Sequence, residues 1–184
     1  MRPPDPPPPA LDTAASEHFT FRDFCTCSEA WRRTQVENVP QEAATYAAIR
    51  RLCEQILEPV LAEFGAPRLT YGFAGAKLIR QIRAGVAPAL DQHAGYERRA
   101  SGALICPRGG QAVDLSAPGV SAWSLADYIA SALPFDRLYI YGDDRPIHVS
   151  VGPEMAGSIV HVDRSRLRPV PRRLDLAGLR ARRP

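Results

Sequence analysis

Residues 41–64 read QEAATYAAIRRLCEQILEPVLAEF and carry the most regular pattern in this chain of 184 residues. Their apolar residues recur every three or four positions, a spacing that gathers them on one face of an α-helix. Asn38 and Pro40 precede the pattern and Gly65 follows it, so we expect a helix along the whole segment. Pro59 is expected to kink its last turns because proline has no backbone N–H to donate. The apolar positions are Ile49, Leu52, Cys53, Ile56, Leu57, Val60, Leu61 and Phe64.

Short runs rich in β-branched and aromatic residues follow this helix, and turn residues bound them, which predicts strands. The turn Gly142-Asp-Asp-Arg-Pro146 predicts that the strands on either side of it pair antiparallel. A second helix is predicted over residues 124–133. A long helix followed mainly by strands favours an α+β fold, in which an antiparallel sheet of about four to five strands packs one face on the long helix. The predicted strands are residues 68–73, 111–115, 137–141, 147–151 and 158–162.

The two ends of the chain differ in composition from its middle. Residues 1–9 include six prolines, so we expect residues 1–15 to form a disordered leader. Residues 164–184 contain eight arginines and one acid, within a chain whose net charge is +3. We expect this tail to be a disordered, solvated end, with contacts to nucleic acid or an acidic partner as the alternative. The folded domain is thus expected to span residues 16–163.

Composition also limits the class of protein. Hydrophobic residues make up 45% and charged residues 23%, which is typical of a globular protein. No apolar run approaches the roughly 18 residues that a membrane span needs, and nothing before Phe19 resembles a secretory signal. The four cysteines suggest no disulfide framework, and Cys25-Thr-Cys27 lacks a second pair at metal-ligand spacing. We therefore expect a soluble, cytoplasmic protein with reduced thiols.

Three residues stand out as metal ligands: His93, Asp114 and His148. Side chains alternate along a strand, so His148 and Ser150 share one face while their apolar neighbours occupy the other, and Asp114 lies on a polar face in the same way. Two imidazoles and one carboxylate suit a zinc ion that keeps an open coordination position. Two further histidines remain as weaker alternative ligands, His161 and His18.

Short motifs surround these residues in a fixed order: Phe19-Thr-Phe-Arg-Asp-Phe24, Leu69-Thr-Tyr-Gly-Phe73, Asp91-Gln-His93, Gly110-Gln-Ala-Val-Asp114 and Ile147-His-Val-Ser150. Through them, about three quarters of the chain resembles the M15-type zinc carboxypeptidases, especially their peptidase M15A C-terminal branch. The resemblance implies the fold shared by D-Ala-D-Ala carboxypeptidases and hedgehog proteins. It also implies that His93, Asp114 and His148 bind Zn²⁺. The implied activity is hydrolysis of a peptide or amide bond.

The sequence departs from the family pattern in the spacing of the ligands. Twenty residues separate His93 from Asp114, more than in the family. Residues 94–109 therefore form an insertion, which we expect to be either a lid over the metal or a solvated loop. The side chains of Ser150 or Asp91 are expected to hold an imidazole tautomer from behind the ligands.

Two other departures concern substrate binding and catalysis. The substrate arginine of the family is missing from residues 71–75, which leaves Arg80 and Arg83 as candidates. No acid stands at the family position of the general base, so Asp144 and Glu97 are the alternative bases, unless Asp144 only forms a turn. The sequence thus predicts a zinc-dependent hydrolase acting on a small, intracellular peptide or amide. The alternative is a non-catalytic module of the same fold that binds a partner.

Overall fold

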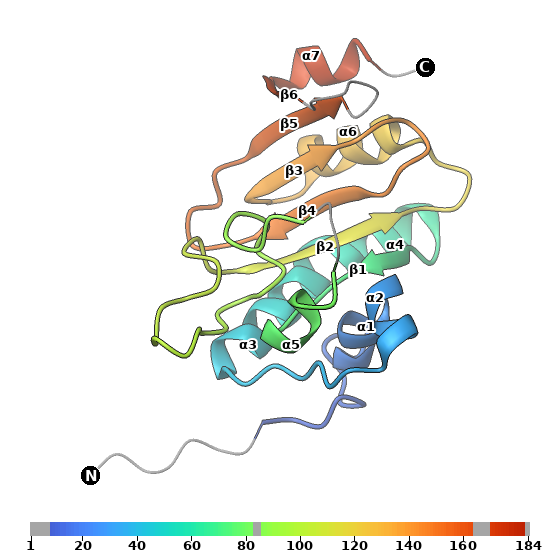
Figure 1. Ribbon diagram of the computed structural model, residues 1–184. Coiled ribbons are helices and arrows are strands. Elements are labelled where there is room, and N and C mark those ends of the chain that lie inside the picture. The colour runs from blue at the N-terminus through green and yellow to red at the C-terminus, as the bar shows by residue number, and fades with distance from the viewer. Residues whose placement is uncertain (1–7, 83–85, 164–169, 183–184) are drawn as a thin grey trace.

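One open sheet of six strands forms the centre of the molecule, as the computed structural model shows for residues 8–82, 86–163 and 170–182 (Figure 1). The strand order is β1-β2-β4-β3-β5-β6, and every neighbouring pair is antiparallel except β3 and β5, which are parallel. The predicted α+β class is confirmed. The prediction of an antiparallel sheet of about four to five strands was wrong, because the sheet has six strands and one parallel pair. The strands are β1 (Arg68–Tyr71), β2 (Gln111–Ser116), β3 (Arg137–Ile140), β4 (Ile147–Val151), β5 (Ser158–Asp163) and β6 (Val170–Leu174).

The predicted long helix is present as three consecutive segments, α3 (Ala43–Leu52), the π-helical turn η1 (Cys53–Leu57) and α4 (Glu58–Phe64). Pro59 explains the widened turn, because it has no N–H for the carbonyl group four residues earlier and its ring would crowd that carbonyl. The backbone N–H of Glu58 instead reaches back five residues to Cys53. The helix ends at Gly65, as expected.

Helices cover one face of the sheet and form the core with it. Figure 1 shows α3, α4 and α6 (Ala122–Ala132) behind the strands, with α6 close to the predicted residues 124–133. The predicted helix stripe from Ile49 to Val60 is buried there, and so are Val113 and Leu115 of β2 and Ile147 and Val149 of β4. Within the described residues, the helices are all too short or too polar to cross a membrane.

The opposite face of the sheet carries a row of residues that stand side by side across five strands. Tyr71 of β1 pairs with Asp114 of β2, Asp114 with His148 of β4, His148 with Tyr139 of β3, and Tyr139 with Val160 of β5. The long loop that follows β1 passes over this face and includes α5 (Ala76–Ile79). Two short helices, α1 (Phe21–Thr26) and α2 (Glu29–Thr34), lie near β1 (Figure 1).

Both chain ends are more ordered than the sequence suggested. Ala15 is buried and its N–H donates to Phe19, so the described end of the leader packs on the domain. In the C-terminal segment, β6 pairs with β5, and α7 (Leu176–Arg180) buries Leu179 against the core. The arginine-rich composition hid the apolar residues that hold this segment down. Residues 1–7, 164–169 and 183–184 of the predicted leader and tail lie outside the described residues.

Gly110 is expected to be essential to the start of β2. It has a left-handed backbone (φ +87°), and a Cβ there would collide with the carbonyl oxygen of Val151 on β4. We predict that Gly110→Ala lowers the free energy of unfolding by more than about 3 kcal/mol, measured by urea denaturation. Gly119→Ala is the matched control, because Gly119 is also left-handed (φ +68°) but has open space around it. The control is expected to lose about 1 kcal/mol; equal losses would contradict the steric explanation.

Candidate metal centre

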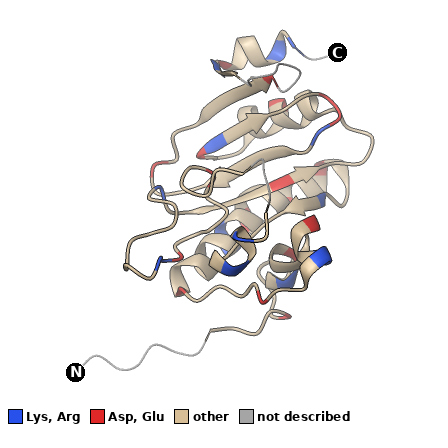
Figure 2. Ribbon diagram, in the orientation of Figure 1, with Lys and Arg blue, Asp and Glu red and all other residues tan. Residues whose placement is uncertain are grey.

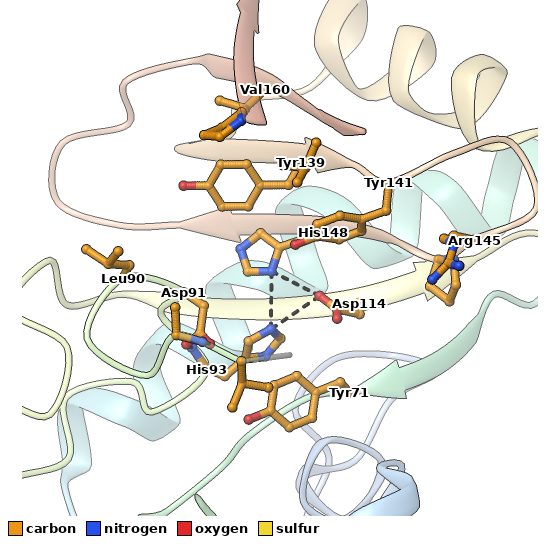
Figure 3. Close-up of a pocket in the computed structure, with 15 residues that line it drawn as sticks. Tyr71, Leu90, Asp91, His93, Asp114, Tyr139, Tyr141, Arg145, His148 and Val160 are labelled. Carbon is orange, nitrogen blue, oxygen red and sulfur yellow. Dashed lines mark hydrogen bonds and ion pairs between the residues drawn. The ribbon is translucent and has the colours of Figure 1, made fainter. Parts of the chain in front are cut away.

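The three predicted ligands meet at one point of the sheet face. His93 Nε2 lies 3.2 Å from His148 Nδ1 and 3.2 Å from Asp114 Oδ1, and His148 Nδ1 lies 2.9 Å from the same carboxylate oxygen. Figure 3 shows the three side chains turned toward one another. Ligand atoms about 2.0–2.2 Å from a tetrahedral zinc ion stand roughly 3.3 Å apart, so this triangle has the size that such an ion requires. Within the described residues, it is the one group of histidine, cysteine and acidic side chains with this geometry.

The hydrogen bonds of the imidazoles fit a metal centre as well. His93 Nδ1 lies 2.7 Å from the backbone oxygen of Gly72, which can only accept, so Nδ1 carries the hydrogen and a neutral His93 directs the lone pair of Nε2 into the triangle. His148 Nε2 is buried without a hydrogen-bonding partner in the described part of the chain. If that nitrogen carries the hydrogen, Nδ1 of His148 also presents a lone pair. Three atoms with lone pairs, from His93, His148 and Asp114, then face one point. They would repel one another unless a positive charge, such as a metal ion, lay between them.

Burial and mutual attraction determine the charges of the group. Burial lowers the pKa of His148. Burial also opposes protonation of His93, but the adjacent Asp114 carboxylate outweighs it, so the pKa of His93 is raised. Burial by itself would raise the pKa of Asp114. The adjacent His93 and His148 outweigh burial, so the pKa of this carboxyl group is lowered. Asp114 is therefore an anion and a suitable metal ligand.

Regular structure positions two of the ligands, and a buried polar network positions the third. Gln92, next to His93, is fully buried and has a left-handed backbone (φ +59°), an unfavourable conformation for a residue other than glycine. Its side-chain amide donates to Gly109 O (2.8 Å) and Asp136 Oδ2 (2.9 Å), and it accepts from Ser150 Oγ (2.7 Å). Ser150 shares a strand face with His148. Gln92 therefore ties the loop of one ligand to the strand of another.

A pocket with a volume of about 500 Å³ opens beside the triangle. Among the described residues, its lining is largely aromatic and aliphatic, with one cation, Arg145, and one carboxylate besides Asp114, namely Asp91. Figure 3 shows Asp91 and Arg145 on opposite sides of the ligands. The further lining residues are Tyr71, Val86, Ala87, Leu90, Tyr139, Tyr141, Pro146, Val160, Val162 and Pro171.

The two bases predicted from the sequence lie elsewhere among the described residues. Glu97 is buried, but its carboxylate accepts from the N–H groups of Gln41 and Glu42 and from Thr45 Oγ1, so it caps the start of α3. Burial raises its pKa. Asp144 is exposed in the turn between β3 and β4 and does not line the pocket. The sequence pattern missed Glu97 as a cap because it is distant from the helix along the chain.

Of the two predicted substrate arginines, Arg80 is not brought to the ligands. Arg80 lines a separate hollow with Arg98 and Arg99, and Arg83 lies outside the described residues. The insertion 94–109 does not form a lid over the three predicted ligands, because no residue from it lines the pocket. Residues 86–91, just before His93, form one wall of the pocket instead. Insertion residue Arg108 supports that wall from behind, donating to Leu90 O and to the hydroxyl of Tyr139.

The weaker alternatives also have other positions. The ring centroid of His161 lies 5.1 Å from that of Trp123, and His18 pairs with Glu58. Ser150 donates to Gln92 and Asp91 accepts from backbone N–H groups, so neither orients an imidazole through a ring nitrogen. The four cysteines are buried and free, and burial raises the pKa of Cys25, Cys27 and Cys53 to about 12.

Several pocket residues were overlooked in the sequence. Tyr139 and Tyr141 alternate with the buried Leu138 and Ile140, and this spacing of two was the available signal that both tyrosines share the ligand face. No such signal exists for Arg145, whose place depends on the hairpin turn.

A comparison of the chain with models of known protein families finds no match, and searches among curated proteins and among solved structures find none either. The resemblance to M15-type peptidases therefore remains a prediction from the sequence motifs.

Gln92→Ala is predicted to weaken zinc binding by a factor of about 10–100, because the network behind His93 is lost. Competition with a chromophoric chelator measures this affinity. Gln35→Ala is the matched control, since Gln35 is also a left-handed glutamine (φ +51°) but lies exposed at the end of α2. Unchanged zinc affinity in Gln92→Ala would show that the network supports the fold alone.

Proposed function

We propose that this protein is a metal-dependent hydrolase of the M15 peptidase type, with the fold of that family, and that it cleaves a peptide or amide bond. The observation that carries the proposal is the buried triangle of His93, Asp114 and His148, whose donor atoms are 2.9–3.2 Å apart beside an open pocket. Two neutral imidazoles and one carboxylate leave a coordination position for water or substrate. Zinc is the proposed metal.

His93, Asp114 and His148 would hold the zinc ion, which would act as a Lewis acid and lower the pKa of a bound water towards about 7. Hydrolysis of an amide also needs a group that accepts the proton of the attacking water and delivers it to the departing nitrogen. Asp91 is the proposed group, because it is the one carboxylate besides Asp114 among the described residues that line the pocket. It takes the place that Glu97 and Asp144 had in the sequence-based hypothesis.

The metal part of the proposal is tested by elemental analysis of the full chain. We expect about one zinc per chain, and we expect His148→Ala to lose it because only two donors remain. His161→Ala should keep its zinc, since His161 lies on the opposite side of its strand against Trp123. A wild-type protein that binds neither zinc nor another divalent metal would contradict the proposal. Detection of iron or manganese in place of zinc would change the identity of the proposed metal.

The role of Asp91 is tested by the hydrolysis of a panel of dipeptides and N-acyl amides. We expect Asp91→Asn to lower turnover by about 10²- to 10⁴-fold while zinc remains bound. Asp144→Asn is expected to keep full activity, and Glu97→Gln to lose stability through the α3 cap without losing turnover at 25 °C. Full activity of Asp91→Asn would exclude it as the base.

A second candidate function, a non-catalytic binding module, is favoured by the contacts of Asp91. Oδ2 accepts from the N–H of Ala87 at 3.0 Å, and Oδ1 lies 3.3 Å from the N–H of His93. Both oxygens thus have backbone partners, which fits a structural role for Asp91 in the loop before His93. Binding of zinc without hydrolysis of any substrate in the panel would support this function over the first.

A further inference from the structure

The sheet face beside the metal centre is apolar, although no described helix covers it. Tyr139 and Val160 continue the row that contains Asp114 and His148, and Val162 and Pro171 are paired one step further along β5 and β6. All four line the pocket. A sheet with one face in the core usually presents polar residues on the other. An apolar surface that adjoins a polar centre indicates a binding site for an apolar group.

One cation accompanies this apolar surface. Arg145 comes from the turn between β3 and β4, three residues before His148, and lines the same pocket. It is exposed and has no hydrogen bond or ion pair with another described residue. The guanidinium group therefore remains available to a ligand. Two parallel N–H donors make arginine well suited to bind a carboxylate.

On the basis of the proposed metal function, we propose that the substrates are N-acylated amino acids or short peptides with a free carboxylate and a bulky apolar side chain. Arg145 binds the carboxylate, and the side chain packs on Tyr139, Val160 and Val162. A pocket of about 500 Å³ accommodates a molecule of this size. Hydrolysis breaks the amide C–N bond; the hydroxyl of one water joins the carbonyl carbon, and its proton joins the nitrogen.

The charges of the pocket orient such a ligand. Asp91 lies on the side of the metal ligands away from Arg145 (Figure 3), so it repels a carboxylate that the arginine attracts. The carboxylate is thereby directed to one side of the metal centre, and the amide is left near the centre. A ligand without a carboxylate, or with a hydrogen in place of the side chain, lacks one of the two contacts.

Three probes separate the two contacts: N-acetyl-phenylalanine, N-acetyl-phenylalaninamide and N-acetylglycine. Calorimetry with the zinc-loaded full chain measures their binding, using each enantiomer of the chiral probes. We expect one enantiomer of N-acetyl-phenylalanine to bind at least about tenfold more tightly than the amide and N-acetylglycine, given the strength of a charged hydrogen bond and of one buried ring. Equal affinities for the three probes would overturn the proposal.

Variants assign each contact to its residue. Arg145→Ala should lower the affinity for N-acetyl-phenylalanine by about tenfold and leave the affinity for N-acetyl-phenylalaninamide unchanged. Val160→Thr keeps the branched shape of the side chain. It should lower the affinity for N-acetyl-phenylalanine by several-fold and leave the affinity for N-acetylglycine unchanged. Arg80→Ala is the matched control, because Arg80 lies in a separate hollow. An effect of Arg145→Ala that is equal for the acid and the amide would overturn the role of the arginine.

The outcomes separate this inference from the proposed function. Selective binding without hydrolysis would keep the ligand class and refute the hydrolase, whereas hydrolysis of small amides without selectivity would do the reverse. A wild-type protein that binds no metal would refute both. Dimerisation in ultracentrifugation that N-acetyl-phenylalanine does not reverse and Val160→Thr abolishes would assign the apolar surface to a second copy, and would also overturn the inference.

Discussion

The alignment of β2 with β4 is the constraint on which the candidate centre depends. It places Asp114 directly opposite His148, so a carboxylate and an imidazole meet without help from any loop. The buried neighbours on the other face, Val113, Leu115, Ile147 and Val149, hold this alignment. A shift of either strand by one residue would turn its apolar residues away from the core and its Asp114 or His148 into it. The energy of the apolar core thus also positions two donor atoms. The same alignment extends to Tyr71, Tyr139 and Val160 on the neighbouring strands, which makes the pocket a property of the sheet.

The third donor has a different origin, since His93 belongs to a long irregular segment. Hydrogen bonds fix it from three directions: its ring to Gly72, its carbonyl oxygen from the N–H of Ala74, and its neighbour Gln92 to β4 and Asp136. The left-handed backbone of Gln92 is unfavourable by itself, and the buried contacts of its side chain offset that strain. The strained backbone of Gln92 is thus held in place directly beside His93.

Local patterns in the sequence predicted much of this structure. The helix stripe and the alternation along each strand depend on neighbouring residues, so the helix from residue 43 to 64 and five strands were predicted nearly to the residue. The meeting of His93, Asp114 and His148 was also predicted, in part because alternation assigned Asp114 and His148 to one kind of face. What the sequence could not give depends on contacts between distant segments. The parallel pairing of β3 with β5, the cap that Glu97 provides for α3 and the approach of Asp91 and Arg145 to the ligands are of this kind. Leu179 is buried in a segment whose arginines suggested disorder.

The strand β6 has a consequence for the behaviour of the protein at high concentration. It lies at an edge of the sheet, where free backbone groups invite another chain to add a strand and start aggregation. Pro171 has no N–H to offer to such a chain, and Arg172 and Arg173 of the same strand are exposed, so like charges would meet where two edges approach. Figure 2 shows basic residues in blue at this end of the molecule. Proline and arginine, which made this segment look unstructured in the sequence, are residues that keep an exposed strand from polymerising.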